Sequence, residues 1–65
     1  MTAWQARVHD EKMELDMKIS KLQEFFHTDT YCDLPKHEQA LLTRQHITMK
    51  EYANILRERI KHFNT

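Results

Sequence analysis

Hydrophobic residues recur along the first half of the chain at the spacing of one helical face. The stripe consists of Trp4, Val8, Leu15, Ile19, Leu22 and Phe26. The charged residues Glu11 and Lys12 stand where one more apolar residue is expected. Spacings of three, four and seven residues place such side chains on one side of an α-helix. The pattern therefore predicts a helix over about residues 2–26.

Local signals support this first helix. Thr2 is a residue type that caps helix N-termini, although Ala3 and Trp4 after it give no capping box. Opposite charges at a spacing of four residues stabilise a helix by a few tenths of a kcal/mol each, about 0.2–0.5. Three such pairs are present: Arg7–Glu11, Lys12–Asp16 and Glu14–Lys18.

A turn is expected over residues 27–35, because Thr28, Asp29 and Thr30 have side chains that compete for backbone hydrogen bonds. Tyr31 and Leu34 should pack back over this end. Pro35 suits the first turn of a second helix, over about residues 36–62. The stripe of the second helix is Leu42, Gln45, Met49, Tyr52, Leu56, Ile60 (or Arg59) and Phe63. The sequence predicts an all-α fold, a single helical hairpin domain over 1–65 with two antiparallel helices.

Further apolar residues lie off both stripes and call for a second partner. They are Met13, Met17, Leu41, Ile47 and Ile55. A core of this size supplies about 3–5 kcal/mol, and small domains usually add disulfides, a metal or a partner subunit. The chain has 65 residues and one cysteine, so an internal disulfide is excluded. We interpret these additional apolar residues as an interface that assembles hairpins into a homo-oligomeric helical bundle. The alternative is that they are scattered apolar residues of the surface, which are normal when they occur singly.

Composition excludes several classes of protein. Ten basic and ten acidic residues balance, which argues against a binder of nucleic acid polymers. The sequence has no apolar run long enough to span a membrane, and its acidic start does not read as a signal peptide. The single cysteine, Cys32, is typical of a reducing, intracellular compartment. Without glycine, a phosphate or catalytic loop is not expected.

Candidate catalytic and metal-binding residues are few. Glu58 and His62 have the spacing of two metal ligands on a helix. One such pair is weak evidence for a metal site, and a solvated surface is the favoured interpretation of these two side chains. Cys32 stands between His27 and His37, yet a hairpin offers no oxyanion donors for a nucleophile. The carboxylates Asp10, Glu11 and Glu14 lie among cations and favour an ion-paired face. We expect no enzyme, no metal and no cofactor.

The cations suggest a site for a nucleotide. Lys18 and Lys21 flank Ile19 and Ser20 on the first helix, and Arg57 and Arg59 lie near the end of the second. An antiparallel hairpin brings Trp4 close to Arg59 and Phe63. An aromatic ring for stacking and cations for phosphate are what a nucleotide needs. The alternative is a core tryptophan with solvated lysines.

The combined frame resembles a known family. Its first part reads Trp4-x-x-Arg7-Val8-x-x-Glu11-Lys12-x-Glu14-Leu15-x-x-Lys18-Ile19-x-Lys21-Leu22-x-x-Phe25. Its second part reads Leu34-Pro35-x-x-Glu38-Gln39-x-Leu41-Leu42-x-x-Gln45-x-x-x-Met49-x-x-Tyr52-x-x-Ile55-Leu56-x-x-Arg59-Ile60-x-x-Phe63. Over essentially the whole chain this resembles the helical hairpin domain of phage sponges for immune signalling nucleotides, which include anti-CBASS and anti-Thoeris proteins.

The resemblance implies a homo-oligomer, a hexamer, in the cytoplasm of an infected bacterial host. It implies sequestration of cyclic dinucleotides, cyclic trinucleotides or cyclic ADP-ribose isomers without cleavage. Lys18, Ser20 and Arg59 fall where the resemblance implies ligand contacts, and Trp4 is the nearest match to the family's stacking aromatic. With Lys21 they form the predicted ligand-binding set. The alternative function is a structural hairpin that binds a partner protein through its apolar stripes.

Overall fold

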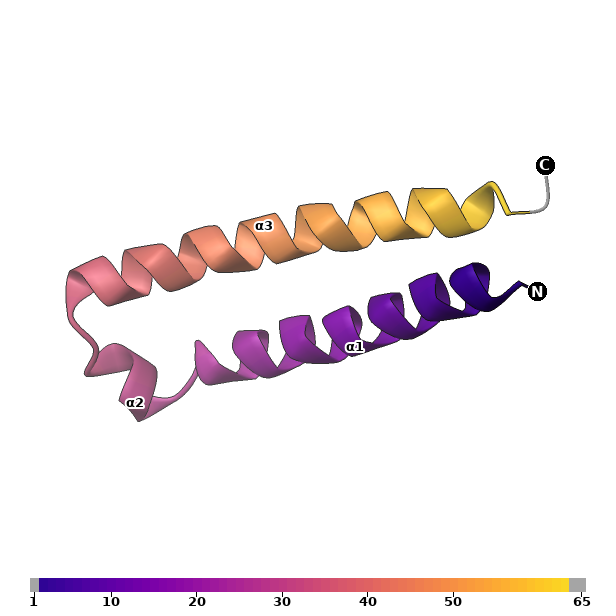
Figure 1. Ribbon diagram of the computed structural model, residues 1–65. Coiled ribbons are helices and arrows are strands. Elements are labelled where there is room, and N and C mark those ends of the chain that lie inside the picture. Colours follow the sequence, from indigo (N-terminus) through magenta and orange to yellow (C-terminus); the bar gives the residue numbers. More distant parts are fainter. Residues whose placement is uncertain (1, 64–65) are drawn as a thin grey trace.

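The computed structural model describes residues 2–63, and all of its regular elements are helical. They are α1 (Ala3–Phe25), α2 (Asp29–Cys32) and α3 (Lys36–Lys61). Figure 1 shows α1 and α3 running antiparallel, with α2 at the turn, so that the start of α1 and the end of α3 lie at the same end. The molecule measures 47 × 15 × 14 Å. The all-helical prediction is confirmed for the described residues.

The core is a narrow seam between α1 and α3. Four residues of the described chain are buried: Val8, Leu15, Ala53 and Leu56. Leu56 is fully buried, and Ile19, Met49, Ile60 and Phe63 pack against this group. The seam residues of α3 alternate by four and three positions, the spacing that keeps one face of a helix against a partner helix. Among the helices of residues 2–63, none is both long and apolar enough to cross a membrane.

The predicted stripe of α3 was wrong at two positions. Gln45 is exposed, and Tyr52 is 42% exposed at the side of the seam. Their neighbours His46 and Ala53 face α1 instead: Ala53 is buried, and the His46 ring packs edge-on against Phe26 at 5.3 Å. The seam residues of α3 are spaced by four and three residues in turn: Leu42, His46, Met49, Ala53 and Leu56. Because histidine is polar and alanine is small, the hydrophobic pattern of the sequence did not indicate these two positions.

The N-terminus of α1 is capped more completely than expected. The Thr2 hydroxyl accepts a hydrogen bond from the Gln5 backbone N–H at 3.4 Å, and the Gln5 side-chain oxygen accepts one from the Thr2 N–H at 3.0 Å. This reciprocal pair is a capping box, with glutamine at the third helical position. The expectation that Ala3 and Trp4 preclude one was wrong, because the box depends on Gln5.

The turn contains a short helix where only a loop was expected. The Thr28 hydroxyl caps α2 by accepting from the Tyr31 N–H at 3.2 Å. The Gln39 amide donates to the carbonyl of Tyr31 at 2.9 Å and to those of Cys32 and Leu34 at 3.4 Å each. The two N–H groups of this amide are shared among carbonyls at the end of α2, and the Tyr31 carbonyl also accepts from the Leu34 N–H at 3.1 Å. The turn therefore needs no glycine.

Aromatic rings close the seam at the turn. Tyr31 lies edge-to-face on Phe26 at 5.0 Å and on Phe25 at 5.9 Å, as the expected packing of Tyr31 over this end requires. Phe26 also contacts His46. The Nε2 atom of His46 is buried here without a hydrogen-bond partner in the described structure. Such a group costs free energy, because it loses its bond to water and gains no replacement.

We expect His46→Leu to stabilise the hairpin. A buried unpaired polar atom costs about 1–3 kcal/mol, and leucine keeps the contact with Phe26 without it. In a domain of this size about 1 kcal/mol raises the Tm by roughly 4–8 °C. Thermal melting followed by circular dichroism at matched concentration measures this. His37→Leu, at an exposed position of α3, is the control and should change little. A lower Tm for His46→Leu would contradict the assignment of a cost to Nε2.

Candidate functional site

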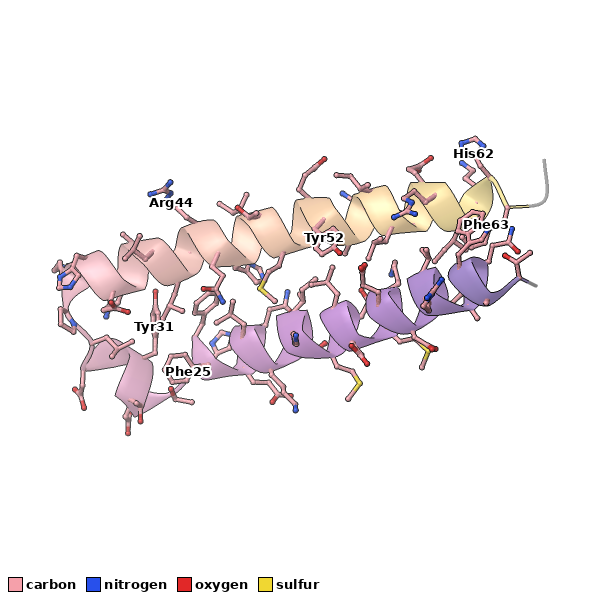
Figure 2. All side chains as sticks on the ribbon, in the orientation of Figure 1. Phe25, Tyr31, Arg44, Tyr52, His62 and Phe63 are labelled. Atoms are coloured by element: carbon pink, nitrogen blue, oxygen red, sulfur yellow. The ribbon has the colours of Figure 1, made fainter. Side chains whose placement is uncertain are left out.

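The predicted site residues fall into two groups, and the first lies where α1 begins and α3 ends. Trp4 packs edge-to-face on Phe63 with ring centroids 5.2 Å apart, and His9 meets the same ring at 5.6 Å. Figure 2 shows Phe63 turned toward the start of α1. The predicted proximity of Trp4 and Phe63 is present. Trp4 remains 49% exposed, so part of its ring surface is available to another molecule.

The second group lies farther along α1. Lys18 and Lys21 line one shallow hollow with Glu14 and Met17, and Ser20 lines an adjoining one that shares Met17 and Lys21. The structure therefore brings Lys18, Ser20 and Lys21 together around an exposed methionine. Lys18, Ser20 and Lys21 form with Met17 an open surface and not an enclosed pocket, and the carboxylates of Glu14, Asp16 and Glu24 line the same hollows.

The two groups are far apart within one hairpin. Lys18 is fourteen residues beyond Trp4 on the same helix, which corresponds to about 21 Å. Arg59 lies on α3 four residues before Phe63, about 6 Å along the helix, and therefore near the Trp4 end. One chain thus does not gather Trp4, Lys18 and Arg59 around a common ligand. A site that uses all three needs two copies of the hairpin.

Tyr52 and Glu11 link the helices on the side of the seam that carries Arg59. Figure 2 shows Tyr52 directed from α3 toward α1. Its hydroxyl donates to the two carboxylate oxygens of Glu11, at 2.7 and 2.6 Å. This contact occupies the gap that Glu11 leaves in the apolar stripe of α1. Of the ion pairs expected along α1, Lys12–Asp16 forms at 2.6 Å, whereas Glu11 is engaged by Tyr52.

The contact with Glu11 changes the titration of Tyr52. The hydrogen bond to Glu11 is the largest cause that raises the pKa of Tyr52 above its ordinary value of 10.0, followed by desolvation and by the charge of Glu11. The positive charge of Arg59 acts in the opposite direction. A neutral phenol donates to a carboxylate, whereas a phenolate repels it, so the protonated form is the one that holds the helices together.

Sequence reasoning missed a groove on the opposite side of the seam. Lys12 and Asp16 of α1 face Lys50, Asn54 and Arg57 of α3 across a hollow of about 230 Å³. The spacing of Lys50, Asn54 and Arg57, by four and then three residues, is a helical stripe beside the seam. That signal was in the sequence, but it could be used only with the correct seam, since Ala53 and not Tyr52 faces α1.

The described residues give little support to metal or thiol chemistry. Within residues 2–63, no group of three or more His, Cys, Asp or Glu side chains is placed to hold a metal ion. Cys32 is an exposed thiol at the end of α2. The cationic and apolar surfaces are the prominent features of the described residues.

Comparison with known proteins gives two matches of nearly full length. The Sequestin family matches residues 2–62. The chain is also 41% identical over 63 residues to a 7.5 kDa protein of Enterobacteria phage T4 encoded in the denB-rIIB intergenic region, a match that covers 97% of this chain and 98% of the relative. No solved structure matches the chain.

The raised pKa of Tyr52 predicts how the hairpin responds to alkaline pH. A group whose pKa is raised on folding contributes stability that is complete below its unfolded value, near pH 10, and is lost as the pH rises through the folded value. Tyr52→Phe should therefore lower the Tm at pH 8, and the difference from the wild type should shrink above pH 10. Melts across this pH range test it. Tyr31→Phe, which keeps its ring contacts, should show no comparable change, and a pH-independent effect of Tyr52→Phe would refute the role of the Glu11 bond.

Proposed function

The chain belongs to the Sequestin family, and on that premise we propose that it is a phage anti-defence protein that sequesters cyclic nucleotide immune signals of a bacterial host. The family match over residues 2–62 is the observation that carries this function, since the family name points to sequestration. The similarity to a protein of phage T4 supports a phage setting, and the host cytoplasm is where such signals would be met. Cyclic dinucleotides, cyclic trinucleotides and cyclic ADP-ribose isomers are the proposed ligands, as the resemblance to anti-CBASS and anti-Thoeris hairpins implies.

The exposed apolar residues support binding between copies. Five of them leave 50–64% of their surface exposed: Met13, Met17, Leu41, Ile47 and Ile55. Self-association would bury these side chains, and each contact between copies would also turn open hollows into covered ones. We propose a homo-oligomer, a hexamer by the resemblance, with ligands held between hairpins.

The proposed ligand contacts combine the two separated groups from different copies. Lys18 and Lys21 of one hairpin and Arg59 of another would donate charge-assisted hydrogen bonds to phosphate oxygens. Trp4 offers the exposed part of its ring for a base, and Ser20 adds a hydroxyl that can donate or accept. Such a site binds the ground state of its ligand.

Sequestration, unlike catalysis, gains from tight ground-state binding. A catalyst must bind a transition state more strongly than its substrate, which requires a positioned acid, base, nucleophile or metal. We propose that the protein is not an enzyme and that the bound nucleotide remains intact. A second candidate, a structural hairpin that binds a helical partner protein, rests on the same exposed apolar residues. It differs in one respect: its stability would not respond to nucleotides.

We expect the purified protein to be an oligomer. Light scattering at micromolar concentration should give a mass several times that of the 8.0 kDa chain. Leu41→Glu and Met13→Glu should each lower that mass, because a buried unpaired charge opposes association. The exposed Gln23→Glu adds the same charge on the surface of α1 and serves as the control. A monomeric wild type would exclude a site built between copies.

The ligand should stabilise the protein and be released unchanged. At a free concentration 100 times the Kd, a ligand that binds the folded state adds about 2.7 kcal/mol of stability. A thermal-shift panel of cyclic dinucleotides, cyclic trinucleotides and cyclic ADP-ribose isomers identifies it. Chromatography after heat denaturation should then recover the ligand chemically intact. Linear product that grows with time and protein concentration would indicate an enzyme, and no shift with any ligand would favour the partner-binding alternative.

Variants of the proposed contacts test the location of the site. Lys18→Ala or Arg59→Ala should lose roughly 2–4 kcal/mol of binding, because each leaves a charged ligand group unpaired. The mass measured by light scattering should not change. Lys36→Ala removes the same charge from an exposed site at the start of α3 and should bind normally. Unchanged affinity in both site variants would show that the ligand lies elsewhere.

A further inference from the structure

The interhelical groove concentrates positive charge in a chain whose formal net charge is zero. Three cations, Lys12, Lys50 and Arg57, line it with one carboxylate, Asp16. Two positive charges are therefore in excess within a hollow of about 230 Å³. Lys12 and Asp16 are hydrogen-bonded at 2.6 Å, so the carboxylate holds the Lys12 ammonium in place. An ammonium has three donors, and those not used on Asp16 are available to a ligand.

Ala53 gives the groove its depth. It occupies a seam position between the larger residues Met49 and Leu56, and it is itself buried. Ala53 and Ile19 both line the hollow. A side chain that ends at Cβ leaves room between the helices where a larger one would fill it. The groove is therefore a feature of two helices in one hairpin and does not require a second copy.

We propose that this groove binds a phosphate group that carries two negative charges. A phosphate monoester has a charge of about −1.5 to −2 at neutral pH and three acceptor oxygens, which match the excess charge of the groove and its donors. The Arg57 guanidinium can pair with two oxygens at once, and Lys12 and Lys50 act as point charges. The Asn54 amide adds a neutral donor beside them.

The size of the groove limits which part of a ligand enters it. Pockets that enclose drug-sized ligands occupy about 300–1,000 Å³, so a hollow of about 230 Å³ holds a phosphate but not a whole nucleotide. The outer face of α3 beside Lys50 and Asn54 carries Ile47 and Ile55, which self-association would cover. Glu51 lies on the same face, and its charge disfavours a second phosphate there. The ligand class is thus a phosphate monoester whose remaining part lies outside the groove.

This site is separate from the one proposed for cyclic nucleotides. Arg57 and Arg59 are two residues apart, which turns their side chains about 200° away from each other around α3. Arg59 lies on the side of Tyr52 and Glu11, whereas Arg57 lies in the groove. The groove does not depend on sequestration or on the oligomer, and either site can be present without the other.

The test is an NMR titration of the isotope-labelled protein with adenosine monophosphate, with inorganic phosphate and with 3′,5′-cyclic adenosine monophosphate. The first carries a dianionic phosphate and a base, the second lacks the base, and the third has a singly charged diester. We expect saturable shifts at Lys50, Asn54 and Arg57 with the first two, and weaker binding of the cyclic form. Equal affinity for the cyclic form would overturn the charge argument.

Charge-removing variants locate the site. Lys50→Gln and Arg57→Gln should each weaken binding of adenosine monophosphate by about tenfold, the effect of losing one charge-assisted bond. Lys36→Gln, an equal loss of charge on the same helix, should leave the affinity within about twofold. An equal loss in all three variants would mean non-specific attraction and overturn the proposal. Leu41→Glu, which should disrupt the oligomer, should preserve the shifts, and their disappearance would disprove a site within one hairpin.

Discussion

The seam between α1 and α3 is the contact on which the rest of the molecule depends, because two helices can bury only one stripe of each other. Three large side chains, Val8, Leu15 and Leu56, are buried in it, and fully burying such a side chain is worth about 1.5–3 kcal/mol. The remaining contacts between α1 and α3 lie beside this seam or at its ends. The Tyr52–Glu11 bond bridges the place where α1 has no apolar residue, and aromatic rings cover both ends. The same limit leaves Met13, Met17, Leu41, Ile47 and Ile55 on the outside.

Much of the fold could be predicted from the sequence, since periodicity, Pro35 and the absence of glycine all indicate two long helices joined by a turn. The side of α3 that faces α1 could not be predicted as well. Gln45 and His46 are both polar, and Tyr52 is a larger hydrophobic residue than Ala53, so local preference pointed one residue away from the true seam. Only the packing against α1 shows which residue of each pair faces the seam. The His46 ring packs against Phe26, and Ala53 lies beside Lys12 and Ile19, where the space between the helices suits a small side chain.

The candidate sites were harder to predict than the fold for the same reason. Lys18, Ser20 and Lys21 are neighbours in sequence and remain neighbours on α1, so their grouping could be foreseen. Lys12 and Arg57 are far apart in sequence, and they line one groove only because Ala53, and not Tyr52, faces α1. The contact between Trp4 and Phe63 could be predicted, because ring contacts at a helix end depend mainly on the antiparallel direction of the two helices.

The backbone of the described residues never adopts a positive φ angle, and the sequence has no glycine. Side chains other than proline are thus compatible with the conformation at nearly every exposed position, since no site demands a residue without a Cβ. The outward-facing residues of α1 and α3 can therefore be substituted without any movement of the main chain. The phage T4 relative has almost the same length and is 41% identical, and a scaffold of this kind permits such divergence. Selection can therefore retune what the surface recognises by side-chain replacement alone, and the seam is the part that must be conserved in volume.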